Sequence, residues 1–343
     1  MIQLIDLVHS SEWDSIVKSF SNWDVYYLSG YVKAFHIHGD GDPYLLYYEE
    51  NGLRAIYVYM RRQTALDGVF DSVTPYGYGG VLFEGKDSKK NRQLFWKEYV
   101  EKMNDESIVD NFVRYHPVLK NALPMKEVSD VIDLGHTIAM DLASPEVIWE
   151  NIVSKNRNMI RKAEKNGIEI LNGKGMELMD QFMEIYNATM RKDNAEEYYF
   201  FKRPFYESVD RDLKDNYEMF YAMYQGRPIA MSIMIFANGR LNYHLSGSDI
   251  EYRNLAPSNL LLYKAALWGC EQGFKTFHMG GGVGSSEDGL YKFKAAFNKY
   301  SDYQFSIGKQ IFDQEKYDEL VKIHRESDAG FDEDSHFFPL YRA

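Results

Sequence analysis

Three apolar runs joined by two tight turns place the strongest constraint on what this chain can fold into. Residues 217–248 are divided into three segments by Gln225-Gly226 and Asn238-Gly239. Pairs such as Asn-Gly favour two-residue hairpin turns, because these turns need positive φ angles. The pattern therefore predicts three consecutive strands in this half of the chain.

A hairpin signal of the same kind lies in the first half. Residues 44–60 form two β-rich runs around Glu50-Asn51-Gly52. Each hairpin region follows helical segments and precedes a strand, a helix and another strand. Two copies of one α/β unit is the economical interpretation, with a boundary between residues 133 and 145.

The length of 343 residues suits two domains of ordinary size, and a hydrophobic share of 45% supplies their cores. We therefore expect an α/β fold of two units, each with a mixed, largely antiparallel sheet flanked by helices. The expected segments are a first unit at residues 1–135, a second unit at residues 136–310, and a C-terminal helix and tail at residues 311–343 that packs back on the body.

Charge and hydropathy limit the partners and the compartment. The net charge of −12 disfavours a broad nucleic-acid footprint, so we expect no DNA partner. No stretch approaches the roughly 20 consecutive apolar residues of a membrane helix, and residues 1–17 lack the basic leader of a signal peptide. Cys270 is the only cysteine, and packing on a helix explains it. We expect a cytoplasmic protein without a transmembrane segment.

Basic residues gather on one predicted helix, residues 149–167. Arg157 and Arg161 are four residues apart, so they lie on one face and are able to grip one anion together. The alternative is a solvated basic helix face.

A glycine-rich turn follows a predicted strand at residues 280–284. Consecutive glycines let backbone approach a ligand closely, and their N–H groups can hold an oxyanion or phosphate, although glycine clusters also form ordinary loops. The next helix begins near Asp288, a suitable N-cap, and carries Phe293 and Lys294. A lysine in this place could stabilise the charge that develops in acyl transfer, and the alternative is a surface lysine.

Two further segments combine aromatic rings with polar groups. Tyr76 and Tyr78 alternate with glycines after a predicted strand, which suits sugar or peptide recognition or a turn with packed tyrosines. Lys202, Arg203 and Tyr206 follow an aromatic cluster, and they could grip a phosphate or belong to a loop that packs its own aromatics.

Several kinds of chemistry find no support in the sequence. The nine histidines lack HExxH or any paired ligand spacing, and we expect no metal. There is no GxSxG elbow for a covalent intermediate, and Cys270 has no identifiable base. The glycine run is neither GxGxxG opening a helix nor a Walker A loop.

The region from 150 to 300 resembles the Fem-type aminoacyltransferases that build peptidoglycan bridges. Residues 154–170 look like the helix-to-strand element of that family. The order and spacing of the later motifs also match: Tyr243 to Ser248, Tyr252-Arg253, Pro257, Leu260 to Leu262, Gly273, Gly280-Gly281 and Leu290 to Phe297.

The first half resembles the family less closely, through Ser29, Tyr31 and Lys33. Its Thr74–Gly80 segment, together with the closing Pro339–Arg342, is similar to relatives placed with bacterial surface-polysaccharide genes and described as GNAT-type acetyltransferases.

The resemblance implies a double GNAT fold in which an amine attacks an activated acyl carbonyl, without a metal or a covalent intermediate. It places Phe293 and Lys294 at the acyl-donor end, with Lys294 stabilising the tetrahedral intermediate, and it implies acceptor phosphates held by Lys33 and by Lys202 or Arg203 with Tyr206. Together with the patterns above, the candidate acceptor-binding residues are Lys33, Tyr76, Tyr78, Lys202, Arg203, Tyr206 and Tyr243. The candidate donor-binding residues are Arg157, Arg161, Arg253, Gly281 and Gly282. Asp249, near the end of a predicted strand, is a further catalytic candidate.

Two departures from the family bear on the acyl donor, which is either aminoacyl-tRNA or acyl-CoA. The chain has no coiled-coil insertion of the kind that some members use for tRNA. The GNAT pyrophosphate loop, R/Q-x-x-G-x-G/A, corresponds to residues 253–258, where both glycine positions are changed and Pro257 lacks an amide donor. This argues against coenzyme A binding in the usual way.

The leading hypothesis is an acyltransferase that acts on an amine of a cell-envelope saccharide or peptidoglycan precursor, either a small molecule or lipid-linked. The attacking amine must be neutral, and Asp249, Glu251 and His244 are the candidates for the base. One alternative is a non-catalytic GNAT-like module that binds a polysaccharide precursor. RNA binding as the main task is a third hypothesis, and it predicts steep salt dependence.

Overall fold

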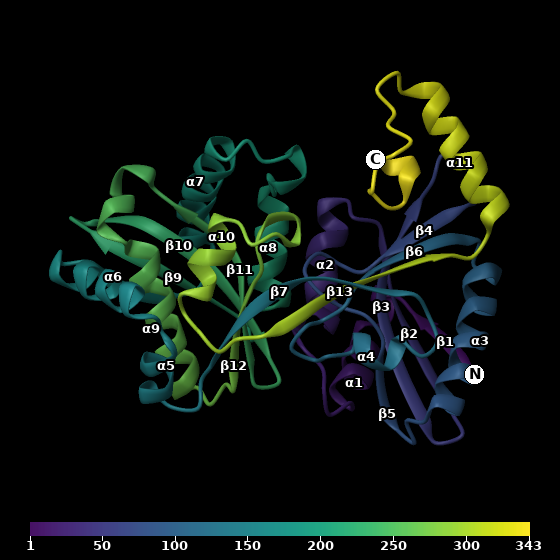
Figure 1. The fold of residues 1–343 in the computed structure, drawn as a ribbon, viewed down its shortest axis with the longest axis horizontal. Coiled ribbons are helices and arrows are strands. Elements are labelled where there is room, and N and C mark those ends of the chain that lie inside the picture. The colour runs from purple at the N-terminus through teal and green to yellow at the C-terminus, as the bar shows by residue number, and fades with distance from the viewer. The chain divides into compact units, whose positions relative to one another are not determined.

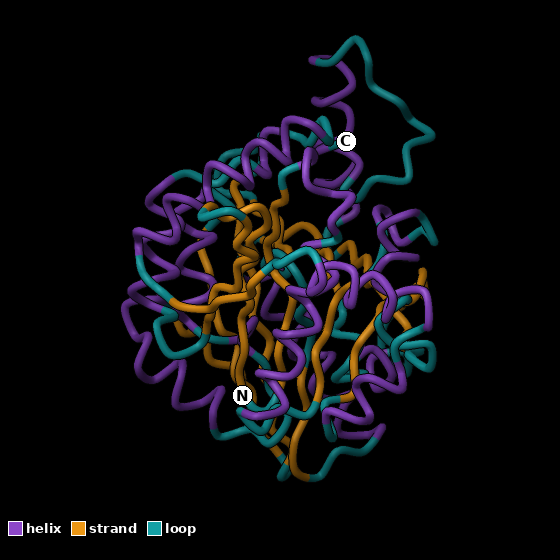
Figure 2. The backbone as a smooth tube through the Cα atoms, turned by 90° about the vertical axis from the view of Figure 1, so that its left-hand side faces the viewer, coloured by secondary structure: helices purple, strands orange, loops and turns teal.

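The computed structural model describes residues 1–343 and divides into two compact units. The first unit contains residues 1–134 and 305–343, and the second contains residues 135–304. In each unit helices lie outside the strands (Figure 1; Figure 2). The predicted α/β class with mixed sheets is confirmed. No helix combines the length and the apolar character that crossing a bilayer requires.

The first unit orders its strands as β1-β2-β3-β4-β6-β13, and β5 also pairs with β3. The strands are β1 (Ile2–Ile5), β2 (Asp42–Glu50), β3 (Leu53–Gln63), β4 (Phe70–Val73), β5 (Leu82–Gly85), β6 (Ile108–Arg114) and β13 (Tyr303–Ile311). The helices are α1 (Ser10–Lys18), α2 (Ser29–His38), α3 (Lys89–Asp105), α4 (Ala122–Met125) and α11 (Gln314–Ser327). The predicted hairpin at 44–60 is confirmed as β2 and β3, and Asn51 and Gly52 have positive φ angles.

The second unit orders its strands as β7-β12-β11-β10-β9-β8. The strands are β7 (Val131–Asp141), β8 (Glu169–Gly173), β9 (Tyr217–Tyr224), β10 (Arg227–Ala237), β11 (Arg240–Ser248) and β12 (Thr276–Gly280). The helices are α5 (Pro145–Asn151), α6 (Ser154–Lys165), α7 (Met176–Lys192), α8 (Arg203–Asp212), α9 (Pro257–Glu271) and α10 (Gly289–Ala295). The three predicted strands at 217–248 are confirmed as the antiparallel run β9, β10 and β11.

Two expectations from the sequence need correction. Residues 305–310 were expected in the second unit, but they cluster with the first because β13 pairs antiparallel with β6. Residues 149–167 were expected to form one helix, but Ile152 is extended and separates α5 from α6. The break has a packing reason, because the Ile152 side chain is fully buried and the N–H of Val153 donates to the carbonyl of Ala296.

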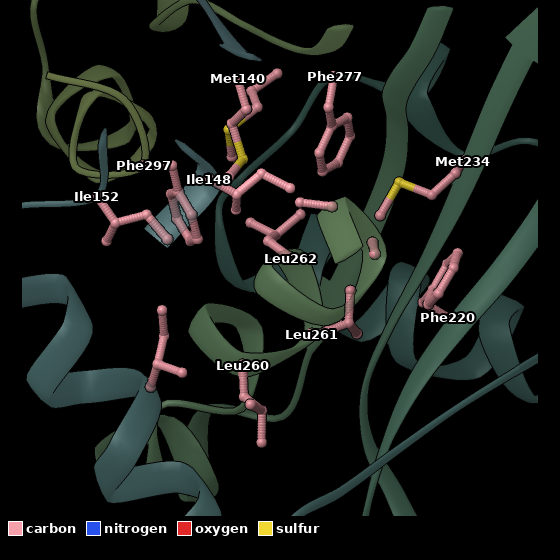
Figure 3. Packing of buried hydrophobic residues seen from close by; sticks show 14 of the residues in the cluster. Met140, Ile148, Ile152, Phe220, Met234, Leu260, Leu261, Leu262, Phe277 and Phe297 are labelled. Atoms are coloured by element: carbon pink, nitrogen blue, oxygen red, sulfur yellow. The ribbon is translucent and has the colours of Figure 1, made fainter. Parts of the chain in front are cut away.

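The core of the second unit lies between its sheet and α9. Leu260, Leu261 and Leu262 of α9 are buried with Met234 of β10 and Phe277 of β12 (Figure 3). Side chains alternate between the two faces of a strand, so one face of the sheet packs against α9. The other face is covered by α7, whose backbone at Tyr186 leaves no room for a Cβ at Gly247 of β11.

In the first unit, residues after α11 pack over a pair of buried carboxyl groups. Tyr341 donates a hydrogen bond of 2.5 Å to Asp110, and the Arg342 guanidinium pairs with Asp71. The side chains of Asp71 and Asp110 are fully buried, and burial raises the pKa of Asp110 to about 7. The carboxyl group of Asp110 therefore depends on the Tyr341 hydroxyl as its hydrogen-bond partner.

We predict that Tyr341→Phe lowers the free energy of unfolding by about 1–3 kcal/mol, because a buried carboxyl group loses its hydrogen-bond partner. Urea unfolding of the full chain measures this. Tyr300→Phe is the matched control, because that side chain is 72% exposed and should change stability little. Equal stability of the two variants would contradict this role for Tyr341.

Candidate active site

Two neighbouring parallel strands of the second unit pair over only three residues each. Arg240 to Asn242 of β11 pair with Thr276 to His278 of β12, but β11 then continues to Ser248 without pairing with β12. The pairing of β10 with β11 shifts register between Ile233 and Met234. The two parallel strands therefore separate from Tyr243 onward, and the side chains that follow can line the opening.

The glycine turn after β12 is compact and depends on residues without side chains. A Cβ at Gly282 would lie 2.1 Å from the carbonyl oxygen of Ser286 and 2.5 Å from Oδ1 of Asp288. The Asp288 carboxylate accepts hydrogen bonds from the N–H groups of Val283 and Tyr291. The N–H of Val283, within the predicted anion-binding run, is thus already occupied by a carboxylate.

Lys294 lies in α10, behind this turn, and its side chain points inward. Its Nζ donates a hydrogen bond of 2.7 Å to the carbonyl oxygen of Gly281 and lies 6.0 Å from the centre of the Tyr243 ring. Lys294 is only 8% exposed. The structure thus brings Gly281, Tyr243 and Lys294 together at the point where β11 and β12 separate.

Burial sets the charge state of the groups in this cluster and of His244, the residue after Tyr243. Burial lowers the pKa of Lys294 to about 8, and the Asp288 carboxylate acts in the opposite direction. Burial raises the pKa of Tyr243, whose hydroxyl is hydrogen-bonded to Ser232 and Ser246. Burial also lowers the pKa of His244 to about 3. Lys294 is therefore the cation of the cluster at pH 7.

The three candidates for the base differ in what their side chains contact. Asp249 caps the N–H of Glu251 and forms a 2.9 Å ion pair with Arg227, so both of its carboxylate oxygens are engaged. Glu251 is exposed, and His244 is neutral and adjacent to Tyr243 in β11. No hydrogen bond or ion pair joins Asp249 to Lys294, and the role of each candidate stays a prediction.

Phe293 lies beside Lys294 in α10 and packs against the core of the second unit. Its ring meets the ring of Phe297 edge to face at 5.5 Å. Phe293 therefore anchors α10, and this contact fixes the backbone that carries Lys294.

Arg157 and Arg161 of α6 both lie over the ring of Trp149. Their guanidinium carbons lie 5.9 Å and 5.1 Å from the centre of the Trp149 ring, and neither forms an ion pair. The 3-10 helix η4 (Ile250–Leu255) packs against α6 and exposes Arg253. These predicted donor-binding cations thus form no ion pair, and no hydrogen bond joins them to Lys294.

The loop that corresponds to the GNAT pyrophosphate loop keeps a glycine-like backbone. Ala256 precedes α9 with φ +60° and ψ 44°, in the left-handed region that favours glycine. Pro257 is the first residue of α9, so this position has no N–H to offer. Ala256 therefore keeps the backbone conformation that a glycine would have at this position. Pro257, in contrast, lacks the backbone N–H that other residues would offer to a pyrophosphate.

The predicted acceptor residues of the first unit form an aromatic cluster. Tyr76 stacks with Phe35 at 5.5 Å, and its carbonyl accepts a 2.6 Å hydrogen bond from the hydroxyl of Tyr31. Tyr78 meets Tyr26 edge to face at 5.8 Å. Lys33 belongs to α2, as Tyr31 and Phe35 do, and is half-buried.

The predicted acceptor residues of the second unit are largely engaged within the protein. Arg203 pairs with both Asp180 and Glu207, and Lys202 is exposed. Tyr206 is fully buried against Phe205, and its hydroxyl has no hydrogen-bond partner. Tyr243, in contrast, lies in the Lys294 cluster, so these four residues do not form a single site.

Ser232 was missed by the sequence analysis. It lies in β10, is 2% exposed and is hydrogen-bonded to Tyr243 across the sheet. No local motif marks it, because its role comes only from strand pairing. No group of three or more His, Cys, Asp or Glu side chains is placed to hold a metal ion.

We predict that Lys294→Met stabilises the fold at pH 7. The fall in the pKa of Lys294 from 10.5 to about 8 corresponds to a cost of roughly 3 kcal/mol at neutral pH, partly offset by the hydrogen bond to Gly281. The depressed pKa means that this cost is absent above pH 10.5, grows as the pH falls to about 8, and is constant below that.

Urea unfolding should therefore give a gain of about 1–2 kcal/mol at pH 7 that shrinks toward pH 10. Lys292→Met is the matched control, because Lys292 lies in the same helix and is exposed. A gain that did not depend on pH would contradict the buried charge.

Residues 154–295 match the model of the acetyltransferase (GNAT) domain family. This segment runs from α6 through α10 and includes Tyr243, Gly281 and Lys294. No curated protein sequence matches the chain.

Three solved structures are similar over most of the chain. The crystal structure of FemX has a TM-score of 0.69 and 13% identity, and the match covers 92% of this chain and 99% of that one. The C-terminal domain of a protein from Agrobacterium fabrum, described as a lysylphosphatidylglycerol synthetase, has a TM-score of 0.59 and 14% identity over 89% and 91%. A conserved protein of unknown function from Bacteroides thetaiotaomicron has a TM-score of 0.58 and 12% identity over 90% and 99%.

At these identities the structures establish the fold. The chain has the fold of FemX, the predicted resemblance to Fem-type proteins is confirmed at that level, and residues 154–295 match the acetyltransferase (GNAT) domain model.

Proposed function

We propose that this protein transfers an acyl or aminoacyl group to an amine of a cell-envelope saccharide or peptidoglycan precursor. The observation that carries the proposal is the buried ammonium of Lys294, held 2.7 Å from the Gly281 carbonyl inside the GNAT domain. When an amine attacks an acyl carbonyl, negative charge develops on the carbonyl oxygen. A fixed cation in a site of low polarity stabilises that charge more than the same cation in water would.

The hydrogen bonding of Lys294 leaves it able to perform this task. An ammonium group has three N–H donors, and one of them is used by Gly281. Two donors remain for an oxyanion. The Gly281 bond also fixes the direction of the ammonium before substrate arrives, so little reorganisation is needed during the reaction.

The reaction also needs a path for one proton. As the new C–N bond forms, the bond from the carbonyl carbon to the donor breaks, and the leaving group takes its electron pair. The amine loses a proton to a base or, through water, to the leaving group. Asp249, Glu251 and His244 are the protein groups proposed for this step.

The names of the similar structures support the proposed substrate class. FemX and a lysylphosphatidylglycerol synthetase lie among them, which favours an aminoacyl donor and a phosphate-bearing or lipid-linked acceptor. Arg157, Arg161 and Arg253 would bind the phosphates of an aminoacyl-tRNA or acyl-CoA donor. Lys33 and the tyrosines of the first unit, Tyr76 and Tyr78, would contact the acceptor. We place this reaction in the cytoplasm.

A non-catalytic binding module is the second candidate. It is favoured by the Asp288 carboxylate, which occupies the N–H of Val283 in the glycine turn. In that case the protein would bind a polysaccharide precursor without turnover.

We predict that Lys294→Met lowers the rate of acyl transfer by about 100-fold or more, because removal of one oxyanion-stabilising donor costs this much in well-ordered sites. Transfer would be measured with acyl-CoA and aminoacyl-tRNA donors and with amino-sugar and muropeptide acceptors.

Lys292→Met serves again as the control and should keep the native rate. A native rate in Lys294→Met would refute the assigned role. Saturable acceptor binding by a native protein that turns over no donor would instead establish the binding module.

A further inference from the structure

A single carboxylate closes the loop between β12 and α10. Oδ2 of Asp288 accepts a 3.2 Å hydrogen bond from the N–H of Val283, at the beginning of the loop. Its Oδ1 accepts a 2.8 Å hydrogen bond from the N–H of Tyr291, in the first turn of α10. The same side chain therefore ties the glycine turn to the helix that carries Lys294.

The glycine turn is packed tightly against this carboxylate. A Cβ at Gly282 would approach Oδ1 of Asp288 to 2.5 Å, so the backbone there lies in direct contact with Asp288. Gly281 is the preceding residue, and its carbonyl accepts the hydrogen bond of Lys294. A displacement of Asp288 would therefore shift the acceptor that orients the ammonium.

The charge of Asp288 also acts on Lys294. The side chain of β11 that faces the ammonium is Tyr243, and it is neutral because burial raises its pKa. From the N-cap of α10, the Asp288 carboxylate favours the charged form of Lys294 and so opposes the effect of burial. No ion pair joins the two side chains, so this effect acts through space while Lys294 is bonded to Gly281.

We propose that Asp288 is a positioning residue for Lys294: by tying the glycine turn to α10 it holds the Gly281 carbonyl against the ammonium, and its negative charge favours the ammonium form. The proposal rests on the function proposed for Lys294 and adds a residue that acts through it. Asp288 has no contact with substrate in this role, so its effect appears in the charge and orientation of Lys294.

Asp288→Asn removes the charge and keeps the cap. Asparagine is as good an N-cap as aspartate, so its Oδ1 keeps the bond from Tyr291 and α10 keeps its start. Its Nδ2 is a donor and cannot accept from the N–H of Val283, so the tie to the glycine turn is lost together with the negative charge. Asp288→Glu keeps the charge and lengthens the side chain. Asp313→Asn is the matched control, because Asp313 caps α11 in the same way, through the N–H of Lys316 in the first unit.

The direct test is an NMR titration of lysine ¹³Cε resonances in the full chain, with the Lys294 signal assigned by its loss in Lys294→Met. The midpoint for Lys294 should fall by about half a pH unit or more in Asp288→Asn, and remain native in Asp313→Asn. In Asp288→Glu it should return toward the native value. A native midpoint in Asp288→Asn would overturn the proposal.

The pH profile of acyl transfer gives a second readout. Its alkaline limb should move to lower pH in Asp288→Asn by the same amount as the NMR midpoint, because the ammonium is lost earlier. A lower rate with an unmoved limb and midpoint would show a structural role only, and would also overturn the proposal. The NMR titration does not need turnover. If the native protein transfers no acyl group, the proposed function is rejected, but the titration midpoint of Lys294 still decides whether Asp288 acts on Lys294.

Discussion

The hydrogen bond between the Lys294 ammonium and the Gly281 carbonyl is the interaction on which the candidate site depends. A buried cation costs free energy unless it is bonded or paired, and Lys294 has no carboxylate within ion-pair distance. Three interactions offset this cost: the hydrogen bond to the Gly281 carbonyl, the negative charge of Asp288 and the face of the Tyr243 ring. A perturbed ionisable group of this kind, at the separation of two strands, is typical of functional sites.

The backbone around Lys294 is arranged to hold that interaction. The turn at Gly282 has no space for a side chain, and Asp288 joins this turn, through Val283, to α10, through Tyr291. Phe293 fixes α10 to the core through Phe297. The ammonium is thus held by short, local contacts within one unit, which is what a preorganised electrostatic site requires.

The distribution of cations supports a second binding region in the same unit. Acidic side chains outnumber basic ones by 51 to 39. Many arginines form ion pairs with them, as Arg203 does with Asp180 and Glu207. Arg157 and Arg161 form no ion pair and instead face the ring of Trp149. In an acidic chain, guanidinium groups that are stacked and without carboxylate partners remain available to an anionic ligand.

Local signals in the sequence were sufficient for the hairpins, because Asn51-Gly52, Asn238-Gly239 and the glycine of Gln225-Gly226 adopt the positive φ angles that asparagine and glycine favour. The proximity of Lys294 to the glycine turn also follows from a short separation along the chain. Features set by distant contacts could not be predicted in this way. The break at Ile152 depends on burial and on a bond from Val153 to Ala296, and the assignment of residues 305–310 depends on pairing with β6. Ser232 meets Tyr243 only through strand pairing.

The most direct measurement is a crystal structure with a tetrahedral phosphonamidate analogue that joins the donor and acceptor groups. The account predicts that an oxygen of the tetrahedral centre binds between β11 and β12, about 3 Å from Nζ of Lys294, with the Gly281 bond retained. A tetrahedral centre bound away from the separation of these strands, with Lys294 still buried and unengaged by the analogue, would contradict it.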